Sequence, residues 1–284
     1  MSFADRIRHC NSYDPTRAIP LRAGEHRIGW LRRDNAGVLA RLGGEVFAVK
    51  TDGACLLPDG NADTISCAVD AVVDKLVAER LVPKWRNETF DVAPRWGEPP
   101  LFRLDRGAVP FFGVRAYGVH LNGYRRINGE YWLWIGKRAS NKQVAPGKLD
   151  NMVAGGIGNG YRASATLTKE AEEEAGVSAE LVANAAAAGA LTYRMETKHG
   201  IRDDVMFVYD LEVPADFTPS NGDGEIAGFE LMPLATVLDR IRTTSDFKFN
   251  VNLVILDFAV RRGVLRPDDQ EYLDVANGLH RPLN

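Results

Sequence analysis

Residues 155–177 read GGIGNGYRASATLTKEAEEEAGV, a glycine-rich run followed by an alanine- and glutamate-rich run. The second run predicts a helix over residues 163–175 that ends at Gly176, because glycine readily adopts the left-handed conformation that closes many helices. At about 100° of rotation per residue, one wedge of this helix carries three carboxylates: Glu170, Glu173 and Glu174. The sequence therefore predicts a glycine loop that leads into an acidic helix face.

The three carboxylates repel one another when they share a helix face. A hard divalent cation such as Mg²⁺ removes this conflict, because it takes oxygen ligands and bridges them to phosphate oxygens. Glycines just before the helix let the backbone approach a metal or a phosphate closely. The pattern favours a metal-assisted phosphate site, and an ordinary solvated acidic face is the alternative on these residues alone.

The spacing of this stretch resembles the Nudix box, Gx5Ex7REUxEExGU, in which U is an aliphatic residue. Gly155 is the leading glycine, Lys169-Glu170-Ala171 takes the place of REU, and residues 173–177 match EExGU. A strand, a glycine loop and a helix are the structural context that the motif requires.

Two positions depart from the box. Tyr161 stands in place of its first glutamate, and Lys169 stands in place of its arginine. In Nudix proteins these two residues usually support the loop and helix rather than the metal. The resemblance therefore implies that another group holds the loop, for which the Tyr161 ring is a candidate, and that the metal-binding residues are intact.

The resemblance implies Mg²⁺ as the cofactor, with Mn²⁺ as a substitute, and metal-activated water as the nucleophile. Glu170 and Glu174 are the expected ligands, with Glu173 sharing this role or orienting water, and the carbonyl of Gly155 adding a further ligand. The general base differs among Nudix enzymes, so the catalytic candidates are Glu173, Glu174 and, in a later loop, Glu225.

A diphosphate substrate needs cations beside the metal. Three basic residues near predicted strand ends are candidates for substrate binding: Arg138, Lys148 and Arg194. Arg138 is favoured by the bidentate geometry that a guanidinium offers to phosphate. At the start of the last long helix, predicted from residue 249 onward, Asn250 is expected to cap the helix, and a contact with substrate is the lesser alternative.

The remaining segments predict an α+β protein. Residues 114–124 and 131–138 are strand-like runs separated by the turn signal Asn128-Gly129, and residues 67–81 have helical periodicity. Residues 93–100 are rich in proline and glycine, as expected of a connection between domains. We predict a smaller N-terminal α/β domain over residues 1–110 and a Nudix domain, a mixed sheet flanked by helices, over residues 111–284.

Further likeness points to one Nudix subfamily, whose members carry an N-terminal domain related to thiamin pyrophosphokinase. It rests on residues 113–124, 134–139, 144–157 and 246–250. In this subfamily some members hydrolyse thiamin diphosphate and its damaged oxo and oxy forms to monophosphates. The alternatives are an ADP-sugar or dinucleotide diphosphatase, an isopentenyl-diphosphate-type isomerase, and a non-catalytic binding protein.

Composition narrows the class of protein. The chain has 284 residues, with 35 lysines and arginines against 38 aspartates and glutamates, and a net charge of −3. This balance argues against a nucleic-acid partner, and the absence of a long apolar run argues against a membrane. We expect a small-molecule diphosphate as partner and a cytoplasmic location, and the sequence leaves a homodimer open. The three cysteines and five histidines are too scattered for a zinc site.

Overall fold

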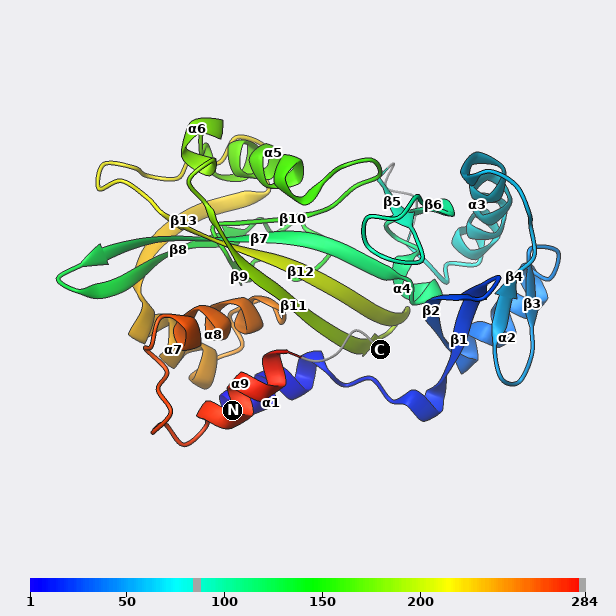
Figure 1. Cartoon of the computed structure of the whole chain (residues 1–284), viewed down its shortest axis with the longest axis horizontal. Helices are drawn as coiled ribbons and strands as arrows, with labels where there is room; N and C mark the ends of the chain where they lie inside the picture. The colour runs from blue at the N-terminus through cyan, green and yellow to red at the C-terminus, as the bar shows by residue number, and fades with distance from the viewer. Residues whose placement is uncertain (84–87, 281–284) are drawn as a thin grey trace.

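The computed structural model describes residues 1–83 and 88–280, and the chain folds as the predicted α+β protein (Figure 1). Its main sheet has the strand order β11–β12–β7–β8–β13, with β10 paired to β7 and β9 paired to β8. The strands of this sheet are β7 (Arg115–Ile127), β8 (Glu130–Arg138), β9 (Leu149–Asp150), β10 (Val153–Gly156), β11 (Ala186–Thr197), β12 (Gly200–Glu212) and β13 (Ile226–Pro233).

The hairpin between β7 and β8 follows directly from the predicted turn. Asn128 and Gly129 both have positive φ, of 52° and 85°, as a tight two-residue hairpin turn requires. Strand β7 pairs antiparallel with β8 and β10 but parallel with β12, which makes the sheet mixed. Since β7 lies at the centre, residues on its two faces reach both layers of helices.

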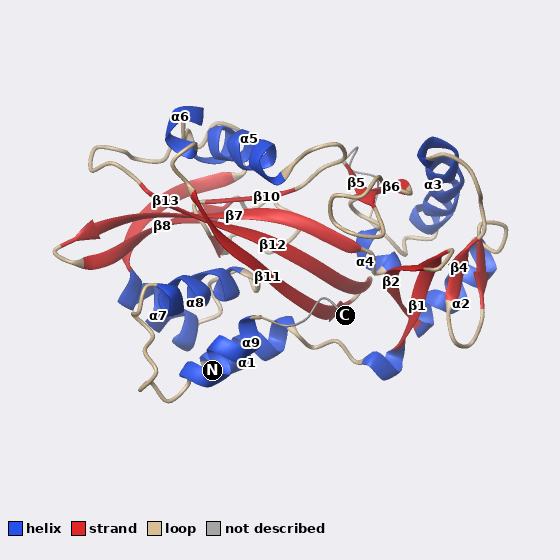
Figure 2. Cartoon of the chain, in the orientation of Figure 1, coloured by secondary structure: helices blue, strands red, loops and turns tan. Residues whose placement is uncertain are grey.

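Helices cover the two faces of the main sheet (Figure 2). Helix α5 (Ala163–Ala175) and the short α6 (Ala179–Val182) lie on one face, and α7 (Leu234–Thr243) and α8 (Val251–Arg261) lie on the other. Gly176 ends α5 with φ of +63°, which confirms the predicted helix and its cap. The apolar side of α5, including Leu167 and Ala171, is buried against Val119 and Leu121 of β7.

The N-terminal part builds a second sheet with the order β2–β1–β4–β3. Its elements, in chain order, are η1 (Pro15–Arg17), β1 (Ala18–Ala23), β2 (His26–Arg32), α2 (Arg33–Leu42), β3 (Phe47–Val49), β4 (Ala54–Leu56) and α3 (Ala62–Ala78). The hairpin of β5 (Thr89–Val92) and β6 (Phe102–Asp105) and the short α4 (Val109–Phe112) then lead to the main sheet. The periodicity at residues 67–81 therefore belongs to a helix that begins earlier, at Ala62.

Helix α1 (Phe3–Cys10) packs away from the N-terminal sheet. Its buried residues Phe3 and Ile7 share a core with α8 and with α9 (Tyr272–Leu279), below the main sheet (Figure 1). The first helix thus joins the larger unit, although it lies within the N-terminal domain predicted at residues 1–110. The predicted boundary itself falls inside α4, and it stays a prediction.

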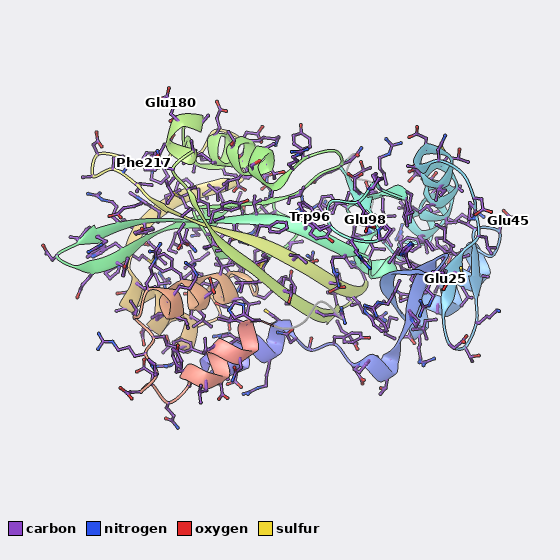
Figure 3. The ribbon with its side chains drawn as sticks, viewed as in Figure 1. Glu25, Glu45, Trp96, Glu98, Glu180 and Phe217 are labelled. Carbon is purple, nitrogen blue, oxygen red and sulfur yellow. The ribbon has the colours of Figure 1, made fainter. Side chains whose placement is uncertain are left out.

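The connection at residues 93–100 packs on the main sheet rather than hanging free. The Trp96 ring lies 4.5 Å from the ring of Tyr117 and 4.8 Å from that of Phe207, centroid to centroid, at the end of the sheet nearest the N-terminal part (Figure 3). This connection therefore adds contacts between the two parts. Within the described portion of the chain, no helix combines the length and the apolar character needed to cross a membrane.

Candidate active site

Gly155 brings the loop backbone against helix α5. It lies opposite Val119 in the pairing of β10 with β7. A Cβ atom on Gly155 would lie 2.3 Å from Cγ and 2.5 Å from Cδ of Glu170. Only a residue without a side chain therefore lets Glu170 lie directly on this strand.

Replacing Gly155 by alanine is expected to lower kcat about 10- to 100-fold, because the added methyl group displaces Glu170 and small misplacements at a reacting centre are costly. The matched control is Gly158→Ala, since a Cβ there meets no atom closer than 3.8 Å. Steady-state rates of the two variants with one diphosphate substrate give the comparison. Full activity in Gly155→Ala would contradict a role for Glu170 at this place.

The glycine loop is held by the N-terminal part of the chain. The Asn159 N–H donates to the Thr89 carbonyl at 2.8 Å, and the Gly160 N–H donates to the Asp91 carboxylate at 2.9 Å. The Tyr161 ring, which we expected to hold the loop, is 52% exposed. That expectation is wrong, and Asp91 on β5 supplies the carboxylate that the box lacks at position 161.

Glu174 is the most deeply buried of the predicted metal ligands. It is 3% exposed, and its carboxylate accepts a hydrogen bond of 2.8 Å from the Ala154 N–H. Burial raises its pKa to about 8, and the negative charges of Asp150, Glu170 and Glu225 act in the same direction. A positive charge at this place would favour the ionised form strongly.

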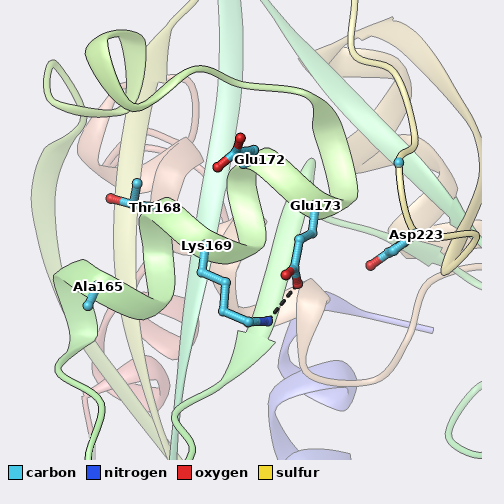
Figure 4. Close-up of a pocket in the computed structure, with 7 residues that line it drawn as sticks. Ala165, Thr168, Lys169, Glu172, Glu173 and Asp223 are labelled. Carbon is cyan, nitrogen blue, oxygen red and sulfur yellow. Dashed lines mark hydrogen bonds and ion pairs between the residues drawn. The ribbon is translucent and has the colours of Figure 1, made fainter.

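Glu170 and Glu173 share the ammonium group of Lys169. Nζ of Lys169 lies 3.2 Å from Glu170 and 2.6 Å from Glu173, and Figure 4 shows the second of these pairs. Burial raises the pKa of Glu170, and the charges of Glu173 and Glu225 add to this effect. Lys169, which replaces the arginine of the box, thus balances two of the three carboxylates. Asp223, on the loop that follows β12, points toward Glu173 (Figure 4).

A cleft of about 270 Å³ lies beside these carboxylates. From the predicted site it is lined by Gly155, Glu170, Glu173, Glu225 and Arg138. From the N-terminal part it is lined by Glu88, Phe90 and Arg106. Phe90 packs so closely on Gly156 that a Cβ there would lie 2.7 Å from the ring. The cleft is therefore shaped by both parts of the chain.

The cleft is also lined by cations. Arg138, 6% exposed, donates to Asp150 at 2.8 Å and to the carbonyls of Val144 and Ala145. Lys248 lines the same cleft and shares Asp150 with it, at 3.1 Å. Two positive charges thus face one carboxylate. Sequence reasoning missed Lys248, although the residue lies inside the segment 246–250 that carries the subfamily likeness.

Glu225 faces the carboxylates from the loop before β13. It forms an ion pair with Lys142, and its side chain is 44% exposed. Burial opposes its ionisation, but the hydrogen bond and the charge of Lys142 outweigh burial, and the pKa of Glu225 is lowered. Glu225 and Asp223, both on the loop between β12 and β13, therefore add two further carboxylates to the lining of the cleft.

Two of the predicted substrate-binding residues are not brought to the cleft. Lys148 donates to the Ser245 carbonyl at 2.6 Å. Arg194 pairs with Asp203 at 3.2 Å, and its guanidinium lies 5.1 Å from the centre of the Tyr13 ring. Neither residue lines the cleft: Lys148 contacts the loop between α7 and α8, and Arg194 contacts β12 and the Tyr13 ring.

The donor set fits an oxygen-ligated divalent cation in its chemistry. Glu170, Glu173 and Glu174 offer carboxylates, which such cations prefer. These carboxylates already act on one another, since the charge of Glu173 raises the pKa of Glu170 and the charge of Glu170 raises that of Glu174. Across residues 1–83 and 88–280, no group of three or more histidine, cysteine or acidic side chains is already gathered in a metal-holding arrangement. Lys169 provides the balancing charge instead.

Comparison with known protein families divides the chain into two matches. Residues 118–251 match the NUDIX domain, and residues 2–116 match a domain of unknown function, DUF4743. A crystal structure from Deinococcus radiodurans aligns with 59% of this chain and 97% of its own, at 22% identity and a TM-score of 0.44.

Two relatives from Arabidopsis thaliana carry the likeness over most of the chain. Nudix hydrolase 20, chloroplastic, is 37% identical over 96% of this chain and 76% of its own length. Nudix hydrolase 24, chloroplastic, is 44% identical over 73% of this chain. The aligned part covers only 57% of that relative's length. Both names place these relatives in the chloroplast, so the expected cytoplasmic location is wrong by this comparison.

The matched range of the NUDIX domain, residues 118–251, includes Gly155, Glu170 and Glu174. Nudix enzymes act on diphosphate-containing substrates and generally use divalent cations. The chain belongs to the Nudix hydrolase family, as a member with an additional N-terminal domain.

Proposed function

We propose that this protein hydrolyses an organic diphosphate to a monophosphate, with Mg²⁺ as the metal and thiamin diphosphate or its damaged oxo and oxy forms as substrates. One observation carries the reaction. One cleft is lined by carboxylates, of which Glu170 lies against Gly155, and by the cations Arg138 and Lys248. Acids that hold a metal and cations that hold phosphate are what this hydrolysis needs.

Glu170, Glu173, Glu174 and the carbonyl of Gly155 are the groups that would hold Mg²⁺. When bound, the metal supplies Lewis-acid polarisation of the diphosphate and lowers the pKa of water. The raised pKa of Glu174 fits this role, because a carboxylate that is costly to ionise alone gains most from a nearby cation.

The other cleft residues hold substrate and accept a proton. Lys248 and Arg138 lie where they attract the charged diphosphate, and Asp150 keeps them in place. Attack of the water oxygen on phosphorus breaks the anhydride bond and leaves a proton to be removed. We propose Glu225 as its acceptor, because this residue lines the cleft and is not among the groups that would hold Mg²⁺.

The N-terminal part contributes to the walls of the site. Phe90, Glu88 and Arg106 line the cleft, and Arg106 lies with its guanidinium 5.7 Å from the centre of the Phe90 ring. Binding sites often lie between domains, where each part shapes one side. We therefore propose that this part selects the organic group of the substrate.

Phosphate or monophosphate release over a substrate panel tests the function. The panel holds thiamin diphosphate, its oxy and oxo analogues, ADP-ribose, NADH and nucleoside triphosphates, each with Mg²⁺, Mn²⁺ or EDTA. We expect turnover that EDTA abolishes and a preference for the thiamin compounds.

Preferred turnover of ADP-ribose or NADH would keep the diphosphatase reaction and discard thiamin. No turnover of any compound would instead favour a protein that binds diphosphates without cleaving them.

A further inference from the structure

The floor of the cleft carries a histidine at the end of a chain of hydrogen bonds. Nδ1 of His120 lies 2.9 Å from Oδ1 of Asn151, whose Nδ2 donates to Oδ1 of Asn122 at 2.9 Å. Nδ2 of Asn122 donates to the carboxylate of Asp210 at 3.0 Å, which also accepts from Arg261. This series of hydrogen bonds therefore begins at the ion pair of Asp210 with Arg261 and ends at His120, which lines the cleft.

This series of hydrogen bonds determines which nitrogen of His120 carries the proton. The carboxylate of Asp210, held by arginines, only accepts hydrogen bonds, so Asn122 must face it with its NH₂ group. Asn122 then offers its oxygen to Asn151, and Asn151 in turn offers its oxygen to His120. The hydrogen therefore sits on Nδ1, and Nε2 carries a lone pair with no partner among the residues that the structure describes.

His120 is suited to accepting a hydrogen bond rather than a proton. Burial lowers its pKa to about 4, and the positive charge of Lys248 lowers it further, against the opposing effect of Asp150. The ring therefore stays neutral at pH 7, and its unprotonated nitrogen can accept a hydrogen bond. Its 5% exposed side chain lines the cleft, where a neutral acceptor serves recognition.

Asn250 supplies a second acceptor on the same floor. It stands at the N-cap position of helix α8, as predicted, but its side chain makes no capping hydrogen bond. Its Nδ2 faces Sδ of Met206 at 3.4 Å, and a thioether sulfur can only accept. Oδ1 is buried and has no hydrogen-bond partner within the described residues. Asn250 is 6% exposed and lines the cleft, so this unpartnered oxygen belongs to a residue that a molecule bound in the cleft would contact.

The two acceptors are linked through neighbouring strands of the sheet. Gly118 lies two residues before His120 on β7, on the same face, and it is in register with Met206 of β12. Asn250 contacts Met206, and both His120 and Asn250 line the same cleft.

We propose that His120 and Asn250 recognise an exocyclic amino group on a heteroaromatic ring of the substrate. Such an amine has two N–H donors, one for Nε2 of His120 and one for Oδ1 of Asn250. A carbonyl oxygen at the same place has no hydrogen to donate, so both acceptors would stay unpaired. An unpaired buried acceptor costs about 1–3 kcal/mol, which is the source of discrimination. The inference rests on the proposed function for the diphosphate end of the substrate and adds the class of its organic end. Among the proposed substrates it favours those that carry the amine over the oxy form.

Binding of monophosphates tests this inference without requiring turnover. Two pairs of probes differ at the amine: thiamin monophosphate against oxythiamin monophosphate, and AMP against IMP. We expect isothermal titration to show about 10-fold tighter binding of the amine in at least one pair. Asn250→Leu and His120→Phe are each expected to abolish that preference, and the second variant covers the case in which one fails to fold.

Asn252→Leu is the matched control. Asn252 lies on the same helix, is buried to a similar degree at 5% exposure, and also has an unpartnered Oδ1, but it does not line the cleft. The preference is expected to survive in this variant. Equal binding of amine and oxygen in both pairs, or loss of preference in Asn252→Leu, would overturn the inference. A clear preference in binding with no hydrolysis of any diphosphate would instead count against the proposed function alone.

Discussion

Replacing Glu174 by glutamine is expected to lower kcat about 100-fold while making the metal-free protein more stable at pH 8. The activity falls because a neutral amide cannot serve as an anionic metal ligand. The stability rises because glutamine keeps an oxygen for the Ala154 N–H but removes a buried carboxyl that is costly to ionise. Loss of function and gain of stability in one variant distinguish this site from a structural glutamate.

The stability gain has a defined pH dependence. Burial raises the pKa of Glu174 to about 8 from its ordinary value of 4.5. Below pH 4.5 the carboxyl holds its proton in both folded and unfolded protein, so it imposes no penalty. As the pH rises from 4.5 to 8, the unfolded state loses its proton more readily, and the wild-type protein loses stability. We expect the advantage of the variant to grow over this interval and to level off above pH 8.

Thermal unfolding in EDTA from pH 5 to pH 9 measures this advantage. At pH 8 we expect about 2 kcal/mol, or a rise in Tm of at least about 4 °C. Glu172→Gln is the matched control, since Glu172 lies on the same helix, is exposed, and points away from the cleft. A variant Glu174→Gln that is fully active, or less stable than wild type at pH 8, would contradict this description of the site.

Replacing Gly113 by alanine is expected to destabilise the fold by roughly 3 kcal/mol or more. Gly113 ends helix α4 with φ of +61°, and a Cβ there would lie 1.8 Å from the carbonyl oxygen of Trp30. The Trp30 N–H donates to the Gly113 carbonyl at 2.9 Å, so the two backbones meet where the N-terminal sheet joins the main sheet. Relief of the clash requires these backbones to separate, which breaks the junction.

Gly24→Ala separates the two causes of this loss. Gly24 has a similar φ of +55°, but a Cβ there meets no atom within 4 Å. It is therefore expected to cost only the left-handed backbone penalty of about 1 kcal/mol. Urea unfolding of both variants gives the difference, which is the contribution of the close contact with Trp30. Equal losses at Gly24 and Gly113 would show that the junction does not depend on this approach.

Local patterns were enough to predict helix α5 and the neighbouring hairpin. The run before Gly176 predicts α5, and the Asn128-Gly129 pair predicts the hairpin of β7 and β8, because caps and tight turns depend on neighbouring residues only. The spacing of Gly155, Glu170 and Glu174 predicts that these residues lie close together, because one loop and one helix connect them.

Groups that come from distant segments could not be predicted in this way. Asp91 holds the glycine loop from 69 residues away, and Lys248 reaches Asp150 across 98 residues. Lys148, and Arg194 as a weaker candidate, were predicted to bind phosphate, but their side chains have other partners. Nothing in the spacing of these residues distinguishes a cation of the cleft from one that serves another contact.

The sequence by itself determined the Nudix box, the acidic face of α5 and the α+β class, because each of these depends on periodicity or on short spacing. The tertiary structure alone decided which cations line the cleft, which side chain holds the glycine loop, and which nitrogen of His120 is left free. These features depend on the pairing of β7 with β10 and β12 and on the packing of the N-terminal part. Such contacts join residues far apart in the chain, and only the folded backbone places them together.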